Sequence, residues 1–187
     1  MCRVPLQTRC VDVAEFDKRH FILRIGLGFE ADMIKGADRR SKNMFGRLAY
    51  VFSAAAAFKK LQEADYDLKI DGKAYHTKGF TCIVANSGSV GFSDLSLDKH
   101  IDVSDGLLDV IVVRKVNIGL FGHILAAILR HERADNVELV QHWQGKRIRV
   151  SSNPPQVLQC DGEIMKDVYL DVKVIPDAAR IIVGPQK

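Results

Sequence analysis

Hydrophobic and polar residues alternate along much of the chain, and this alternation predicts β-strands. Tyr66, Leu68 and Ile70 are separated by the charged residues Asp67 and Lys69. A spacing of two places the three apolar side chains on one face of a half-buried strand. By the same pattern, or because β-branched residues lie between turn residues, further strands are predicted around Val11 and Val13 and over 21–28, 80–85, 107–113, 137–143, 146–151, 168–174 and 180–183.

Two segments, 45–61 and 121–129, instead repeat their apolar residues every three or four positions. This period is typical of amphipathic helices. The predicted strands outnumber these helices and mostly follow one another along the chain, whereas an α/β fold would alternate the two kinds of element. The expected fold class is therefore mainly β: a single domain over residues 1–187, built as an antiparallel β-sandwich or barrel with two helical insertions.

The composition is that of an ordinary globular domain. Hydrophobic residues make up 47% of the chain and charged residues 27%, which excludes a disordered or collagen-like protein. The four cysteines form no Cys-x-x-Cys pair, so we expect no zinc finger and a reduced, cytoplasmic setting. A net charge of +4 is too small to require nucleic acid, although it is compatible with an anionic lipid surface. The longest apolar stretch, around 49–58, is too short to span a bilayer, so any lipid contact would be peripheral.

Three Asp-Gly pairs mark candidate turns. Asp71-Gly72 lies between two strand-like segments and predicts a plain hairpin. Asp105-Gly106 has Asp102 three residues before it and Asp109 four residues after Asp105. Several carboxylates and turn carbonyls can supply the oxygen ligands that Mg²⁺ or Ca²⁺ prefers. From the spacing alone, acids in a solvated turn are the default interpretation and a metal site is the alternative.

The third pair begins the motif Asp161-Gly162-Glu163, which follows an apolar segment and precedes another predicted strand. On an extended chain two carboxylates at this spacing point the same way, so they could share a proton or flank a reacting hydroxyl. The same pattern also fits a charged hairpin tip. The glycines over 26–28 are not followed by the third glycine of a dinucleotide loop, and the six histidines have no metal-ligand spacing.

Taken in order, five short segments resemble the landmarks of the diacylglycerol kinase catalytic family, which includes bacterial lipid kinases and sphingosine and ceramide kinases. The segments are IGLGFEA at 25–31, GRLAY at 46–50, VANS at 84–87, DGLLDV at 105–110 and CDGE at 160–163. The resemblance covers about residues 10–184. The ordered set is specific, whereas each segment alone is not.

The resemblance implies a two-domain enzyme with its active site in the cleft between the domains. The N-terminal domain of such an enzyme carries a Gly-Gly-Asp-Gly-Thr nucleotide loop, which does not occur here, so the chain is expected to be the C-terminal β-sandwich domain without the nucleotide-binding domain. The resemblance assigns a structural Mg²⁺ to Asp105, with Asp102 and the backbone carbonyl of Leu107 completing the site. It places Asp161 and Glu163 near the transferred phosphoryl group, one of them as general base, and leaves open which one.

The expected function is that of the C-terminal domain of an ATP-dependent lipid kinase that phosphorylates a hydroxyl of diacylglycerol or a related lipid. Its cofactors would be Mg²⁺ and ATP, the ATP held mostly by the absent domain, so that the isolated chain is inactive. The protein would be cytoplasmic and peripheral to the membrane, with a homodimer left open. Two alternatives stand beside this function: a non-catalytic β-sandwich module that binds a lipid or a protein, and a kinase for a soluble hydroxyl, as in NAD kinases.

Overall fold

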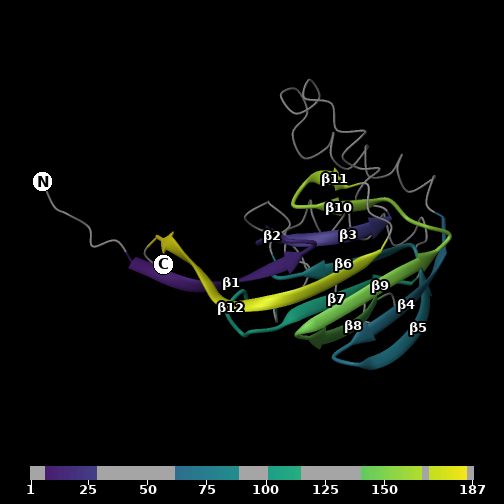
Figure 1. The fold of residues 1–187 in the computed structure, drawn as a ribbon, viewed down its shortest axis with the longest axis horizontal. Helices are drawn as coiled ribbons and strands as arrows, with labels where there is room; N and C mark the ends of the chain where they lie inside the picture. The colour runs from purple at the N-terminus through teal and green to yellow at the C-terminus, as the bar shows by residue number, and fades with distance from the viewer. Residues whose placement is uncertain (1–6, 29–61, 89–100, 115–139, 166–168, 185–187) are drawn as a thin grey trace, which may run out of the picture.

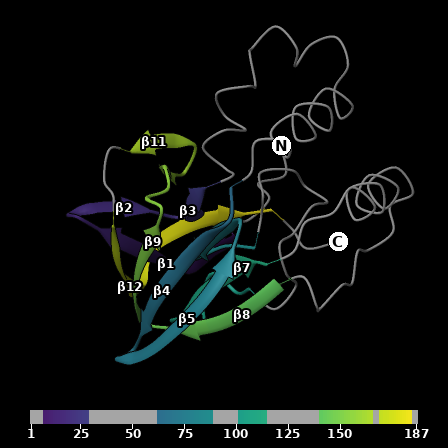
Figure 2. The same ribbon diagram turned by 90° about the vertical axis from the view of Figure 1, so that its right-hand side faces the viewer.

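Two antiparallel sheets of six strands each pack face to face (Figures 1 and 2). The computed structural model describes residues 7–28, 62–88, 101–114, 140–165 and 169–184. In the first sheet the strand order is β2 (Arg19–Phe21), β1 (Gln7–Phe16), β12 (Leu170–Val183), β9 (Arg147–Asn153), β4 (Ala64–Ile70) and β5 (Lys73–Gly79). In the second sheet it is β11 (Glu163–Met165), β10 (Leu158–Cys160), β3 (Arg24–Gly28), β6 (Thr81–Ala85), β7 (Leu108–Val113) and β8 (Val140–Gly145).

The antiparallel sandwich predicted from the alternation is confirmed. In β4, buried residues alternate with residues that are at least partly exposed, as a period of two requires. Every regular element within the described ranges is a strand, and these ranges contain no helix that could cross a membrane. The helices predicted over 45–61 and 121–129 lie outside the described residues, as do Val168 and 137–139 at the ends of predicted strands.

Within the described ranges the chain crosses from the first sheet to the second at three short connections. The strand predicted over 21–28 is divided, because β2 ends at Phe21 in the first sheet and β3 begins at Arg24 in the second. Ile22 and Leu23 make this crossing and are exposed. Phe80 makes the second crossing, between β5 and β6, and residues 154–157 make the third, between β9 and β10. The segment 180–183 is not a separate strand but the end of β12.

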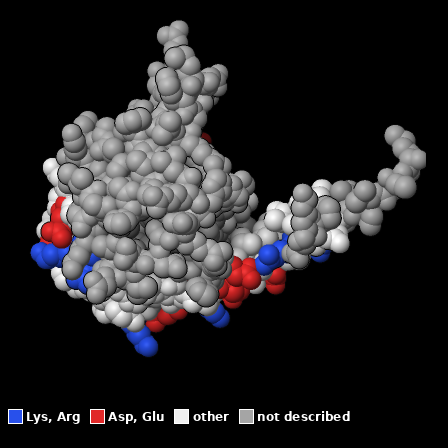
Figure 3. Space-filling model, turned by 180° about the vertical axis from the view of Figure 1, so that it is seen from behind, with Lys and Arg blue, Asp and Glu red and all other residues white. Residues whose placement is uncertain are grey.

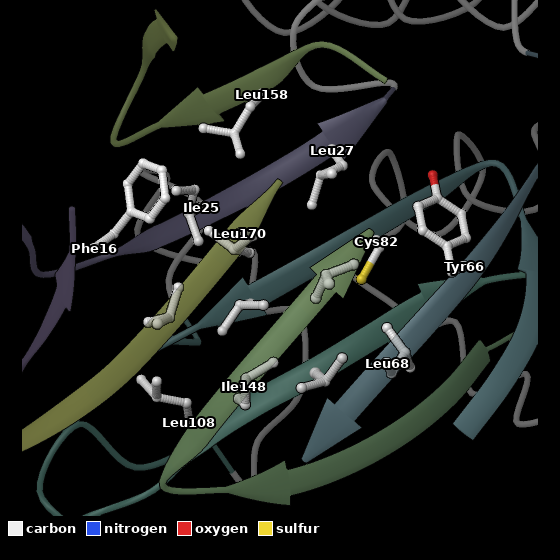
Figure 4. Close-up of a cluster of buried hydrophobic side chains, with 14 of the residues drawn as sticks. Phe16, Ile25, Leu27, Tyr66, Leu68, Cys82, Leu108, Ile148, Leu158 and Leu170 are labelled. Atoms are coloured by element: carbon white, nitrogen blue, oxygen red, sulfur yellow. The ribbon is translucent and has the colours of Figure 1, made fainter. Parts of the chain in front are cut away.

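The hydrophobic core lies between the two sheets. Inward side chains of the first sheet, such as Phe16 and Leu170, meet those of the second, such as Ile25 and Leu158 (Figure 4). Each of these four side chains is at most 4% exposed. Burial of an aliphatic or aromatic side chain of this size stabilises a fold by about 1.5–3 kcal/mol.

The central strands β6 and β7 of the second sheet are buried on both faces, whereas the first sheet exposes its outer face. All five residues of β6 are buried, while buried and exposed residues alternate at the start of β9. On the outer face of the second sheet, Ile83, Ala85 and Ile111 form an apolar cluster separate from the core. Asp109 projects from the same face as Ile111 and is therefore removed from water.

A long ribbon formed by β1 and β12 projects from the body at one end (Figure 1). The pairing runs from Gln7 opposite Val183 to Phe16 opposite Val172, and its register shifts between Val11 and Val13. Asp12 lies at this shift. Acidic side chains gather where the ribbon leaves the body (Figure 3).

Two glycines with positive φ provide a matched test of the packing around the Phe80 crossing. Gly28 has a φ of 96° and a side chain there would place its Cβ 2.7 Å from the carbonyl oxygen of Phe80, whereas Gly72, with a φ of 89°, has no atom within 4 Å of that position. We expect Gly72→Ala to cost about 1 kcal/mol of unfolding free energy through backbone strain alone, and Gly28→Ala to cost about 2–4 kcal/mol because overpacking is added. Urea-induced unfolding measures both values, and equal losses would contradict the close approach at Gly28.

Candidate active site

Asp161 occupies the tight turn between β10 and β11, and backbone amides from another part of the chain hold its carboxylate. The N–H groups of Ile22, Leu23 and Arg24 donate to its oxygens at 3.0, 3.1 and 2.8 Å. The N–H of Asp161 donates in turn to the carbonyl of Arg24 at 3.0 Å. These hydrogen bonds fasten the β10–β11 hairpin to the crossing between β2 and β3.

Glu163 lies in the same hairpin but in a different environment. It begins β11 opposite Cys160 and is exposed, and its carboxylate makes no hydrogen bond or ion pair with the described residues. The premise that the motif is extended is wrong, because Asp161 and Gly162 have φ values of 43° and 96° and form a turn. The hairpin thus brings the two acids together, with one carboxylate bound by amides and the other open to solvent.

The side chain of Asp12 connects the loop before β7 to the ribbon. Since Asp12 lies between Val11 and Val13, the alternation of these residues predicts instead a side chain that faces solvent. Asp12 is 1% exposed. One carboxylate oxygen accepts the N–H of Gly106 at 2.7 Å, and the other accepts the N–H of Asp177 in β12 at 2.9 Å. Two amide donors satisfy a buried carboxylate that lacks a cationic partner among the described residues.

Asn86 extends this connection to the turn of Asp161. Its Nδ2 donates to the carbonyl oxygens of Asp12 and Ile22, both at 2.9 Å, and its backbone N–H donates to the carbonyl of Leu23 at 2.9 Å. Because two carbonyls face Nδ2, the orientation of the amide is fixed by its acceptors. A continuous series of hydrogen bonds therefore runs from the loop at Gly106 through Asp12 and Asn86 to the crossing that holds Asp161.

The three residues expected to bind Mg²⁺ lie in one loop, over 102–107. Asp102 forms an ion pair with Arg9 of the ribbon, and its Oδ1 also accepts the N–H of Ser104 at 3.1 Å. Asp105 accepts the N–H of Leu107 at 2.9 Å. No group of three or more His, Cys, Asp or Glu side chains within the described ranges is arranged to hold a metal. The expected site has only two carboxylates, completed by a backbone carbonyl, so a criterion of three side chains does not test it. The Mg²⁺ site therefore stays a prediction.

The donor chemistry of this loop fits a hard cation. Asp102 and Asp105 each keep one carboxylate oxygen without a hydrogen-bond partner among the described residues, and oxygen ligands are those that Mg²⁺ prefers. A cation here would share Asp102 with the guanidinium of Arg9. Its role would be to brace the loop that Asp12 connects to the rest of the site.

The buried Asp109 pairs with the partly exposed His142, a contact that the sequence did not reveal. The Asp109 side chain is 1% exposed, and its Oδ1 lies 2.6 Å from Nε2 of His142. Burial raises the pKa of Asp109, and the hydrogen bond and charge of His142 oppose that effect. In the sequence, the only sign of this pair is that an acid interrupts the apolar run of β7. Its spacing groups Asp109 with the acids of the preceding turn.

The pKa of the Cys160 thiol depends on the charged side chains of the hairpin. Burial, and next the negative charge of Asp161, raise the pKa of its thiol to about 11, while Arg19 lowers it and Glu163 raises it. The thiol is thus neutral at physiological pH. Its sulfur lies beside the two acids and has no role of its own in the expected chemistry.

Comparison with known proteins decides the family. Residues 24–183 match the model of the family described as the YegS C-terminal NAD kinase beta sandwich-like domain. The chain belongs to this family. The match begins at the strand that follows the crossing and includes both acidic turns and Asn86, whereas Asp12, Ile22 and Leu23 precede it.

The relatives of this YegS C-terminal-type domain are longer proteins. A putative lipid kinase of Staphylococcus aureus is 24% identical over 96% of this chain and 58% of its own length. An uncharacterized protein of Synechocystis, sll0036, is 28% identical over 93% of this chain and 41% of its own length. The chain therefore spans about half the length of the curated relatives that it matches.

Solved structures share the fold. A putative diacylglycerol kinase from Bacillus anthracis superposes with a TM-score of 0.69 at 18% identity, over 96% of this chain and 58% of that protein. A second putative diacylglycerol kinase structure from the same organism gives 0.69 at 20% identity. The expected membership of the lipid kinase group and the mainly β fold are both confirmed for this family domain.

Replacing each acid of the hairpin separates the one held by amides from the one open to solvent. We expect Asp161→Asn to lower the unfolding free energy by about 1–3 kcal/mol, because the new amide nitrogen would replace one of the two acceptor oxygens and face the N–H donor of either Ile22 or Arg24. The amides of these residues should also exchange faster with solvent. Glu163→Gln serves as the matched control and should leave both quantities unchanged. Urea unfolding and amide hydrogen exchange measure the effects; equal behaviour of the two variants would contradict the amide clamp.

The thiol of Cys160 tests whether Glu163 is a charged neighbour. Since a negative charge at Glu163 raises the thiol pKa, Glu163→Gln should lower it and speed alkylation by iodoacetamide at mildly alkaline pH. Peptide mass spectrometry gives the rate at Cys160 separately from the other cysteines. Cys82, fully buried with a pKa raised by burial to about 12, is the internal control and should stay unreactive. An unchanged alkylation rate at Cys160 would contradict a negative charge of Glu163 close to the thiol.

Proposed function

We propose that this domain is the C-terminal part of an ATP-dependent lipid kinase that transfers the γ-phosphoryl group of ATP to a hydroxyl of diacylglycerol or a related lipid. The single observation that carries the proposal is the hairpin of Asp161 and Glu163, fixed by backbone amides at one acid and open at the other. The names of the relatives, putative lipid kinase and putative diacylglycerol kinase, support the same reaction class.

Glu163 is the better candidate for the general base. A base must accept a proton from the substrate hydroxyl, and the Glu163 carboxylate has no hydrogen-bond partner among the described residues that would compete for that proton. The carboxylate of Asp161 already accepts three backbone N–H groups. Asp161 would therefore act as a positioning residue that sets the angle of the hairpin.

The transfer follows from these assignments. The hydroxyl oxygen of the lipid forms a bond to the γ-phosphorus of ATP, the bond from that phosphorus to the bridging oxygen breaks, and ADP leaves with the bridging electron pair. The hydroxyl proton passes to the Glu163 carboxylate. Positioning the hydroxyl in line and accepting its proton are the contributions of this domain, whereas the nucleotide would be held by the portion of the relatives that this chain does not span.

Magnesium would act on the scaffold in this proposal. Asp102, Asp105 and the carbonyl of Leu107 would hold the ion, which would neutralise the two carboxylates of the loop. The hydrogen bonds of Asp12 and Asn86 then transmit the position of that loop to the crossing that holds Asp161.

A non-catalytic lipid- or protein-binding module is the second candidate. The complete engagement of the Asp161 carboxylate by amides favours it, because such an acid can be purely structural. A depression of about 480 Å³ on the outer face of the first sheet is lined by Asp67, Lys69, His76 and Arg149 among others. The depression lies on β4, β5 and β9, whereas the acids lie on the hairpin of the second sheet. It is therefore separate from the candidate active site and supports neither candidate function.

Turnover separates the two candidates. In a protein that joins this domain to a nucleotide-binding domain of the family, we expect Glu163→Gln to lower phosphorylation of diacylglycerol by about 100-fold or more, the usual contribution of a general base. Transfer of labelled phosphate from ATP to lipid in mixed micelles is the measurement. The Ile182→Ser variant, on the projecting ribbon, is the control and should keep full turnover. Full activity of Glu163→Gln would remove the base from this position and favour the binding module.

A further inference from the structure

Three exposed aliphatic residues lie in the two segments that meet at the turn of Asp161, namely the crossing and β11. Ile22 and Leu23, whose backbone amides hold the Asp161 carboxylate, are 43% and 37% exposed. Ile164, which follows Glu163 in β11, is 43% exposed. Single exposed aliphatic residues are ordinary on a protein surface, but three around one polar turn form a local apolar rim.

The rim lies where both sheets end on the same side of the molecule. β2 is the edge strand of the first sheet and β11 that of the second, and the two ribbon views place them on one side (Figures 1 and 2). A contact of 3.5 Å between Nη1 of Arg19 and the sulfur of Met165 connects these edge strands. The crossing, which follows β2, and β11 therefore lie along the same edge of the molecule.

Cationic residues border this edge on the side of β2. Lys18 and Arg19 follow one another at the β1–β2 turn and are exposed, with His20 next to them. The acids at the same edge are Asp17, Asp161 and Glu163, of which Asp161 already has its charge solvated by backbone amides. An aliphatic rim with adjoining lysine and arginine fits a surface that is apolar beneath an anionic layer, which is the chemistry of a lipid bilayer.

We propose that the edge formed by Ile22, Leu23 and Ile164 with Lys18 and Arg19 is a bilayer-docking surface that brings the Asp161–Glu163 hairpin to the lipid headgroups. This inference rests on the proposed function and names the surface through which its site meets the lipid. The hydroxyl of a membrane lipid lies at headgroup depth, so a carboxylate that takes its proton must reach that depth. Ile22, Leu23 and Ile164, which lie in the segments beside this carboxylate, would then be the first residues to contact the acyl chains.

Vesicle binding by the full 187-residue chain tests the docking edge without requiring any phosphoryl transfer. Cosedimentation uses vesicles of phosphatidylcholine alone and of phosphatidylcholine with phosphatidylglycerol. We expect the double variant Ile22→Ser with Leu23→Ser to lower the partition coefficient about tenfold or more, because apolar side chains no longer enter the interface. Lys18→Glu should lower it about fivefold or more, and only on vesicles that contain phosphatidylglycerol. The serine substitutions keep the backbone N–H groups that hold Asp161.

A matched control lies elsewhere on the same protein. Ile182 on the projecting ribbon is 66% exposed, more than any residue of the rim, and Ile182→Ser should leave vesicle binding unchanged. Leu23→Trp should show quenching of its fluorescence by brominated lipid, and Ile182→Trp should not. Circular dichroism spectra and urea unfolding verify that each variant is folded; the two tryptophan variants give the answer if the double serine variant is not.

The outcomes separate this inference from the proposed function. Retained vesicle binding by Glu163→Gln, together with its loss in the double serine variant, supports the docking edge whether or not transfer occurs. Equal losses for Ile182→Ser and the rim variants, or absence of binding by the unaltered chain, would overturn it. Self-association of the unaltered chain that the rim substitutions abolish, seen by light scattering without any change in vesicle binding, would also overturn it and assign the edge to a second copy of the chain.

Discussion

Hydrogen bonds made by the side chains of Asp12 and Asn86 join the loop at Gly106, β12 and the crossing between β2 and β3. Asp12 joins the loop at Gly106 to β12 through backbone amides, and Asn86 joins the carbonyl of Asp12 to that of Ile22. The crossing that contains Ile22 then holds the carboxylate of Asp161. These hydrogen bonds act together with two other contacts of the same loop, from the Asp12 N–H to the carbonyl of Val103 and from the Ser104 hydroxyl to the carbonyl of Cys10, to relate the two acidic turns.

The same device is used at both ends of this connection: a carboxylate whose charge is balanced by peptide dipoles. Asp12 and Asp161 each accept N–H groups from segments distant in the sequence, and no ion pair to a cationic side chain is recorded for either within the described ranges. Amide donors have fixed directions, because the backbone that carries them is itself part of a strand or crossing. They therefore orient a carboxylate more narrowly than a flexible lysine would.

The sequence predicted the sheets well and the connections poorly. Period-two patterns such as that of Tyr66 and Leu68 report burial on one face, and this signal is local, so β4 and the hairpin at Asp71-Gly72 followed from it. The division at Ile22 and Leu23 could not follow, because a change of sheet leaves an apolar run uninterrupted. Asp12 was missed for a related reason: its burial is caused by a loop almost a hundred positions later, at Gly106. The resemblance located the acids, but only the coordinates distinguish the environments of Asp161 and Glu163.

The short length of β2 and β11 affects whether exposed aliphatic residues at the sheet edges promote aggregation. Each of these edge strands has three residues, so each offers few unpaired peptide groups to a strand from outside. Long open margins beside exposed aliphatic residues promote growth of fibres by strand addition. Here both edge strands are short, which limits strand addition beside Ile22 and Ile164.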